Sequence, residues 1–243
     1  MKIICCDYDG TLFQENGIGV SQADRDAIIK FRTQGGKFGI VTGRDLTASY
    51  EVLENLRGII DFLICSTGSV ICDENGRIVN QSKSCNVRSI SEIADEALKN
   101  NVKWFTVIDE TTRYPLDTSG KSSHNYTLPN EFNNCTIWFH TIEDAMSLEK
   151  YIKDNHSGSF TFYRNFECIE ITPLGVNKAS AVRELAGQFE NPMVFTVGDG
   201  ATDVSMVKEF YGFALENSVD DVKNVAKKQC NRVCDMIEII LNI

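Results

Sequence analysis

Two aspartates separated by one residue lie near the start of the chain, in the segment Asp7-Tyr8-Asp9-Gly10. They directly follow the apolar run 2–6, which predicts a buried strand. Ligands of open parallel sheets bind at the carboxyl ends of the strands, so both carboxylates are placed for chemistry. One can act as a nucleophile or metal ligand, and the other can exchange protons. Taken alone, the segment is more often a turn, because Asp-Gly is a common turn dipeptide.

Three later segments repeat this placement. Thr42-Gly43 follows the strand-like run 37–41, Asp199 follows the run 193–197, and Lys178 opens a predicted helix. If these strands are neighbours, one edge of the sheet gathers a set of chemically active side chains: Asp7, Asp9, Thr42, Lys178, Asp199 and Asp203.

This set matches what transfer of a phosphoryl group requires. Mg²⁺ takes hard oxygen ligands, which Asp7 and Asp199 can supply, with Asp203 positioned four residues later to orient them. Lys178 and the metal would offset the repulsion between a carboxylate and a phosphate dianion. Asp7 would then form an aspartyl-phosphate, and Asp9 would protonate the leaving alcohol and later accept a proton from water.

The phosphoryl oxygens need hydrogen-bond donors. Thr42 and the backbone amides of Tyr8, Asp9 and Gly43 are candidates for this task. A calcium loop of the EF-hand type does not fit, because neither Asp7 nor Asp199 begins the required spacing of acids, glycine and glutamate.

The elements that position these residues alternate between strand and helix. Strands are predicted at 2–6, 37–41, 62–65, 193–197 and 212–215, and helices at 21–34, 45–55, 177–188, 201–209 and 235–241. Such alternation is typical of βαβ units and therefore predicts an α/β protein with a parallel sheet.

The middle of the chain has a different pattern. We expect a hairpin over 67–80, a helix led by Ser89 over 89–100, strands at 103–108 and 136–140, a helix over 142–155, and a hairpin over 159–171 that turns at Arg164-Asn165. The polar stretch 109–134 predicts an irregular element or a lid. The predicted organisation is a core of residues 1–80 and 173–243, interrupted by an α+β insert at 81–172.

Composition limits the partners and the compartment. The chain has 24 Lys and Arg against 34 Asp and Glu, a net charge of −10, so a nucleic-acid partner is not expected. The longest apolar runs are too short to span a membrane, and the start of the chain lacks a secretory pattern. The nine cysteines are scattered, which favours reduced, buried thiols and a cytoplasmic protein.

Four motifs together resemble the haloacid dehalogenase (HAD) superfamily. Residues 7–12 match its first motif, 41–44 its second, 175–179 its third and 198–206 its fourth. Within that superfamily the chain looks like the Cof-like phosphatases with a C2 cap of type IIB.

The resemblance implies a Rossmann-like three-layer core, an inserted α+β cap, Mg²⁺, and hydrolysis of small phosphate monoesters, sugar phosphates first among them. It also implies substrate contacts from Tyr8, Gly10, Gly43, Arg44 and Thr202, and metal contacts from Asp7, Asp9, Asp199 and Asp203. The expected partner is a small phosphorylated metabolite, bound by a monomer or weak homo-oligomer.

Two positions depart from the family pattern. Thr202 stands where the family usually has Asn, and Ser66-Thr67-Gly68 stands where it tends to have Asn-Gly. Three alternatives remain open: a phosphosugar mutase of the same fold, a signalling protein that keeps its phosphoryl group, and a relative without catalysis. Cap residues that could reach the substrate are Arg113, Lys121, His124, Arg164 and Asn165.

Overall fold

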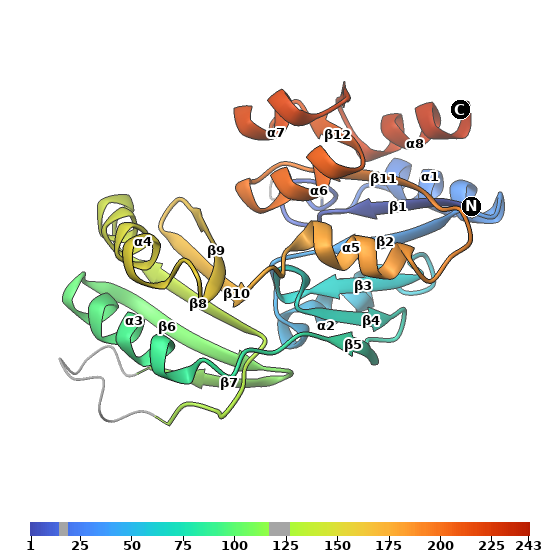
Figure 1. Cartoon of the computed structure of the whole chain (residues 1–243). Coiled ribbons are helices and arrows are strands. Elements are labelled where there is room, and N and C mark those ends of the chain that lie inside the picture. Colours follow the sequence, from blue (N-terminus) through green and yellow to red (C-terminus); the bar gives the residue numbers. More distant parts are fainter. Residues whose placement is uncertain (15–18, 117–126) are drawn as a thin grey trace.

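The structure is a computed structural model, and it describes residues 1–14, 19–116 and 127–243. Two sheets form two bodies, which Figure 1 shows joined by the chain segments after β5 and β10. The larger, eight-stranded sheet has the order β13-β12-β11-β1-β2-β3-β4-β5, and the five-stranded sheet has the order β7-β6-β8-β10-β9.

The large sheet is mainly parallel. β1 pairs in parallel with both β11 and β2, whereas β4 and β5 extend the sheet as antiparallel strands. Its strands are β1 (Lys2–Cys6), β2 (Lys37–Val41), β3 (Phe62–Cys65), β4 (Val70–Asp73), β5 (Ile78–Gln81), β11 (Met193–Gly198), β12 (Tyr211–Leu215) and β13 (Lys228–Cys230).

Helices cover both faces of this sheet. On β1, Ile4 and Cys6 pack into one apolar cluster with α1 (Gln22–Thr33), α2 (Leu46–Asn55) and α8 (Val233–Leu241). Ile3 and Cys5 pack into the opposite cluster with α5 (Lys178–Ala186), α6 (Val204–Glu209) and α7 (Asp220–Val225). Because successive side chains of a strand alternate between faces, one apolar strand supplies both cores. The predicted three-layer α/β core is confirmed.

The smaller sheet is antiparallel and has helices on one face. Its strands are β6 (Val102–Asp109), β7 (Thr112–Pro115), β8 (Asn134–Phe139), β9 (Phe160–Asn165) and β10 (Cys168–Pro173). The helices α3 (Val87–Lys99) and α4 (Ile142–His156) bury their apolar sides against it. We call this body, with its sheet and two helices, the cap.

Some predicted elements differ from the structure. The helix expected at Ser89 begins at Val87, because the Asn86 side chain accepts a hydrogen bond from the Ser89 amide and caps it. The last hairpin turns at Phe166-Glu167 and not at Arg164-Asn165, since Asn165 still pairs with Cys168 and Phe166 adopts a φ of 51°. The elements β7, α7 and β13 were not predicted; each is short and has little periodicity to read.

The stretch 109–134, predicted as an irregular element or a lid, contains β7. Its residues 117–126 lie outside the described part of the chain. All nine cysteines are free thiols, and six of them are buried. Within residues 1–14, 19–116 and 127–243, each helix is too short or too polar to cross a membrane.

Candidate active site

The predicted site residues meet at the carboxyl ends of β1, β2 and β11. The chain leaves β1 toward β2 on one side and returns to pair β11 on the other, so the strand order reverses at β1. A reversal of strand order leaves a crevice at the carboxyl ends of the strands, where ligands of such sheets bind. Asp7 and Asp199 follow β1 and β11 directly, and Thr42 follows β2.

Lys178 lies at the centre of the buried charges. Its Nζ donates to Asp7 Oδ1 at 2.7 Å and to Asp203 Oδ1 at 2.6 Å, and its side chain is only 2% exposed. Lys178 begins α5, whose Asn177 cap accepts a hydrogen bond from the Ser180 amide and so orients the first turn. A single ammonium group therefore partly neutralises the negative charge of two carboxylates that come from opposite ends of the chain.

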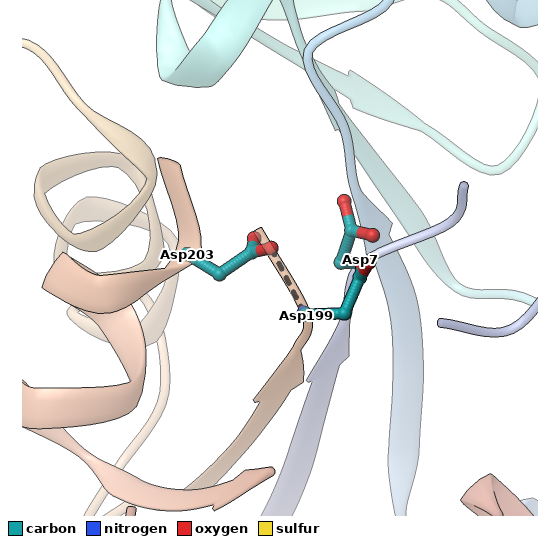
Figure 2. A group of neighbouring side chains, drawn as sticks. All are labelled: Asp7, Asp199 and Asp203. Atoms are coloured by element: carbon teal, nitrogen blue, oxygen red, sulfur yellow. Dashed lines mark hydrogen bonds between the residues drawn. The ribbon is translucent and has the colours of Figure 1, made fainter. Parts of the chain in front are cut away.

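Three carboxyl groups converge beside this lysine. Asp7, Asp199 and Asp203 each offer one oxygen, and these oxygens lie within 4.8 Å of one another. Figure 2 shows Asp7 and Asp199 at the ends of neighbouring strands, with Asp203 hydrogen-bonded to the Asp199 backbone. Thr11 donates to Asp199 Oδ1 at 2.7 Å, and Gly10 leaves space for that carboxylate, since a Cβ there would lie 2.5 Å from it.

The three carboxylates repel one another, and the pKa values of this group reflect it. Burial, followed by the charge of Asp203, raises the pKa of Asp7 well above its ordinary value, although Lys178 opposes this shift. Burial also raises the pKa of Asp199, against the hydrogen bond from Thr11. Burial alone would lower the pKa of Lys178, but Asp203 and Asp7 raise it, so the ammonium stays charged. A divalent cation would relieve the excess negative charge, and the three hard oxygens fit Mg²⁺.

The carboxylate of Asp9 lies outside this group of three. It accepts two hydrogen bonds from Arg44, at 2.8 Å from Nε and 2.6 Å from Nη2. The guanidinium also lies over the Tyr8 ring, 5.1 Å from its centroid. Arg44, predicted as a substrate contact, therefore pairs with Asp9, which was predicted among the metal ligands.

Tyr8 contributes its backbone and not its ring to this edge of the sheet. The side chain is fully buried, and its hydroxyl accepts a hydrogen bond from Asn55. Burial raises the pKa of Tyr8 above its ordinary value.

Thr42 and Gly43 line the site, and a strained loop contacts Thr42. Thr42 is 1% exposed, and its hydroxyl accepts a hydrogen bond from the Arg44 amide. The loop residues Ser66 and Thr67 have φ values of 52° and 55°, a region that costs a residue other than glycine about 1–3 kcal/mol. The Thr67 amide donates to the Thr42 carbonyl at 3.1 Å, which holds this loop against the site.

The cap closes the other wall. Glu170 of β10 accepts a hydrogen bond from the Thr67 hydroxyl, and a Cβ on Gly43 would lie 2.9 Å from its Oε1. Burial raises the pKa of Glu170. A cavity of about 660 Å³ lies between core and cap, and its lining includes every predicted catalytic residue, Gly43, Arg44, Asp199, Thr202 and Asp203.

The cap residues that the sequence suggested as substrate contacts lie in different places. Arg113 and Asn165 line the cavity, and Arg113 forms an ion pair with Asp45 at 2.6 Å. Arg164 forms an ion pair with Glu149 instead. Lys121 and His124 lie outside the described residues.

Sequence reasoning missed several cavity residues, most of them in the cap: Asp45, Ala48, Trp104, Thr106, Ile108, Thr136, Trp138, Cys168 and Glu170. Their strands were predicted, and alternation along those strands could have shown that these cap residues share a face. It could not have shown which face meets the core.

Comparisons with known proteins identify the family and the fold. A model of the haloacid dehalogenase-like hydrolases matches residues 4–236. An uncharacterized protein of Mycoplasma capricolum subsp. capricolum is 26% identical in an alignment that covers 86% of this chain and 88% of that protein.

Solved structures share the fold at lower identity. A haloacid dehalogenase-like hydrolase from B. subtilis has a TM-score of 0.83 and 21% identity, with 98% of this chain and 99% of that one covered. The HAD subclass IIB sugar phosphatase BT4131 has a TM-score of 0.80 and 18% identity, with 100% of both chains covered.

Proposed function

The chain belongs to the haloacid dehalogenase-like hydrolase family, and on that premise we propose that it is a magnesium-dependent phosphatase acting through an aspartyl-phosphate. Its substrates are small phosphate monoesters, sugar phosphates first among them. One observation carries the proposal: the buried Asp7 carboxylate lies 2.7 Å from Lys178 Nζ, on the wall of the cavity between core and cap.

The first half-reaction transfers the phosphoryl group. A carboxylate oxygen of Asp7 attacks phosphorus, the bond from phosphorus to the alcohol oxygen breaks, and Asp9 donates a proton to that oxygen. Arg44 has to release Asp9 for this step, because it now binds both oxygens of that carboxylate. Thr42, Lys178 and the Gly43 amide bind the phosphoryl oxygens.

The second half-reaction regenerates the enzyme. Asp9 removes a proton from water, the water oxygen attacks phosphorus, and the bond to Asp7 breaks to release inorganic phosphate. Asp7, Asp199 and Asp203 would hold Mg²⁺, which supplies positive charge to offset the repulsion between carboxylate and phosphate. Thr202, which lines the cavity, and the Tyr8 amide would contribute contacts to the bound ester. Gly10, predicted with them, does not line the cavity, and its amide already donates to the Phe13 carbonyl at 3.0 Å.

The test is multiple turnover. With Mg²⁺, the purified chain should hydrolyse an aryl phosphate many times per molecule, and a chelator should remove the activity. A burst of one phenol per chain, with the phosphoryl group kept on the chain, would instead indicate a phospho-acceptor signalling protein. An isomerised phosphosugar, detected by phosphorus NMR, would indicate a mutase. The cavity between core and cap favours the hydrolase, because a signalling acceptor needs no enclosed space for a leaving group.

Metal binding should also depend on pH. The raised pKa values of Asp7 and Asp199 mean that the folded chain keeps protons that the unfolded chain loses near pH ~4. Stability without metal therefore falls as pH rises through the folded pKa values. Mg²⁺ replaces those protons, so it should raise the melting temperature by about 3–5 °C near pH ~8 and by clearly less near pH ~5. Equal shifts at both pH values in thermal melts would contradict this metal site.

A further inference from the structure

The loop between β3 and β4, residues 66–69, contacts both of the chain segments that join the core to the cap. These crossing segments are 82–86, which leads into α3, and 174–177, which leads into α5. In the first, the Ser82 amide donates to the Ser69 carbonyl of the loop at 2.7 Å, and the Ser82 carbonyl accepts from Asn133, beside β8, at 2.9 Å. The chain therefore passes from core to cap at Ser82.

The second crossing segment passes the same loop at Gly68. The carbonyl oxygen of Asn177 lies so close that a Cβ on Gly68 would be 2.4 Å from it. One residue earlier, the Val176 carbonyl accepts from the Thr172 hydroxyl of β10 at 2.7 Å. Val176 is thus held by the cap and Asn177 by the core. Both passages occur against one loop, so this loop is where the cap can pivot.

The loop is also bound to the second motif. The Ser66 amide donates to the Arg44 carbonyl at 2.7 Å, and the Thr67 amide donates to the Thr42 carbonyl. Thr67 is fully buried and has a positive φ. A β-branched residue in this conformation is an outlier, and it persists only where the surrounding contacts require it.

The Thr67 side chain supplies such a contact, because its hydroxyl donates to Oε2 of Glu170 on β10. Among the described residues, this is the only hydrogen bond to the Glu170 side chain, whose burial makes loss of the donor unfavourable. Glu170 lies shortly before the second crossing segment, so the bond fixes β10 where it meets the core. The ion pair of Arg113 with Asp45 holds the cap at β7, an edge strand of its sheet.

From these contacts, and resting on the proposed function, we propose that Thr67 is a positioning residue that holds the cap against the core through Glu170, with residues 66–69 as the pivot. Loss of the hydroxyl shifts the cap toward an open arrangement. Thr42 and Lys178 stay in place, because the loop remains bound through its backbone amides. Part of the binding energy of the substrate must then close the cap, so substrate affinity falls while the bound complex reacts at nearly the native rate.

The position of the cap can be followed without turnover, because both tryptophans of the chain, Trp104 and Trp138, line the cavity between cap and core. Acrylamide should quench their emission at least about 1.5-fold more effectively in Thr67→Val, which keeps the branched shape and loses the hydroxyl. Thr67→Ser keeps the hydroxyl and should match the native chain. The control is Thr196→Val, because the buried hydroxyl of Thr196 donates to the Met206 carbonyl within the core; quenching should stay unchanged.

Steady-state kinetics test the consequence for catalysis. In Thr67→Val, KM for a phosphate ester should rise about 10-fold, and kcat should stay within about threefold of the native value. Glu170→Met removes the acceptor from the cap side and should give the same result, so it tests the proposal even if Thr67→Val does not fold. The double variant should be no worse than either single variant, because all three lack the same interaction. Additive increases in KM would overturn the proposal.

The outcomes separate this inference from the proposed function. Equal quenching in the native chain and both single variants, or a fall in kcat with KM unchanged, would overturn the positioning role while the phosphatase stands. Absence of turnover of every ester by the native chain, with the difference in quenching present, would instead overturn the phosphatase and retain the pivot.

Discussion

Replacement of Asp7 by Asn is expected to abolish turnover, with a loss of at least about 10³-fold in kcat. The amide oxygen is a poor nucleophile, so no aspartyl-phosphate forms. Folding should survive, because the change removes a buried carboxylate whose pKa is raised by burial and by Asp203. Lys178 keeps its ion pair with Asp203 at 2.6 Å, so it is not left as an isolated buried charge. Steady-state hydrolysis of an aryl phosphate and a thermal melt without metal measure both effects.

A matched variant separates the two acids of the first motif. Asp9→Asn keeps the nucleophile but loses the group that accepts a proton from the hydrolytic water. With an aryl phosphate, whose leaving group needs little protonation, it should release one equivalent of the phenol rapidly and then turn over slowly. Asp7→Asn should give no such burst. Turnover by the Asp7→Asn variant at the rate of the native chain would refute the assignment of the nucleophile.

Replacement of Lys178 by Met should affect both stability and activity. The lysine is almost fully buried and bonds to Asp7 and Asp203, so its loss leaves three converging carboxylates without a fixed cation. Breaking a buried ion pair from one side costs about 3–5 kcal/mol, which is a large share of the stability of an ordinary domain. Activity should fall as well, since the phosphoryl group loses a cationic donor.

The origin of that loss can be checked with metal and acid. In urea unfolding, Mg²⁺ should recover part of the stability of Lys178→Met, and so should lower pH, because each reduces the repulsion among Asp7, Asp199 and Asp203. The control is Lys150→Met: Lys150 is an exposed residue of α4 that pairs with Asp154, and its loss should leave unfolding unchanged. A loss of stability that neither Mg²⁺ nor acid relieves would mean that the lysine acts through packing alone.

The sequence by itself determined the local features. Short apolar runs, turn dipeptides and acids at strand ends all depend on neighbours within a few residues. These features predicted the parallel core, the insert and the order of the four motifs. They also predicted that Asp7, Lys178 and Asp199 meet, because parallel strands end at one edge.

The tertiary structure decided which side chains pair with one another. The pairing of Asp9 with Arg44 depends on how the loops after β1 and β2 pack together, and nothing in either segment alone determines it. The turn at Phe166 and the Asn86 cap depended on backbone geometry that composition did not reveal.

The cap shows most clearly what the sequence alone could not predict. Alternation along β6, β8 and β10 determined which side chains share a face, but the orientation of the cap placed Trp104, Trp138 and Glu170 against the core. That orientation arises from contacts between distant segments, such as Thr67 with Glu170 and Asp45 with Arg113. Long-range contacts of this kind select one arrangement among many that are locally equivalent. The sequence therefore predicted the acids and the lysine of the site, but it did not predict which cap residues line the cavity.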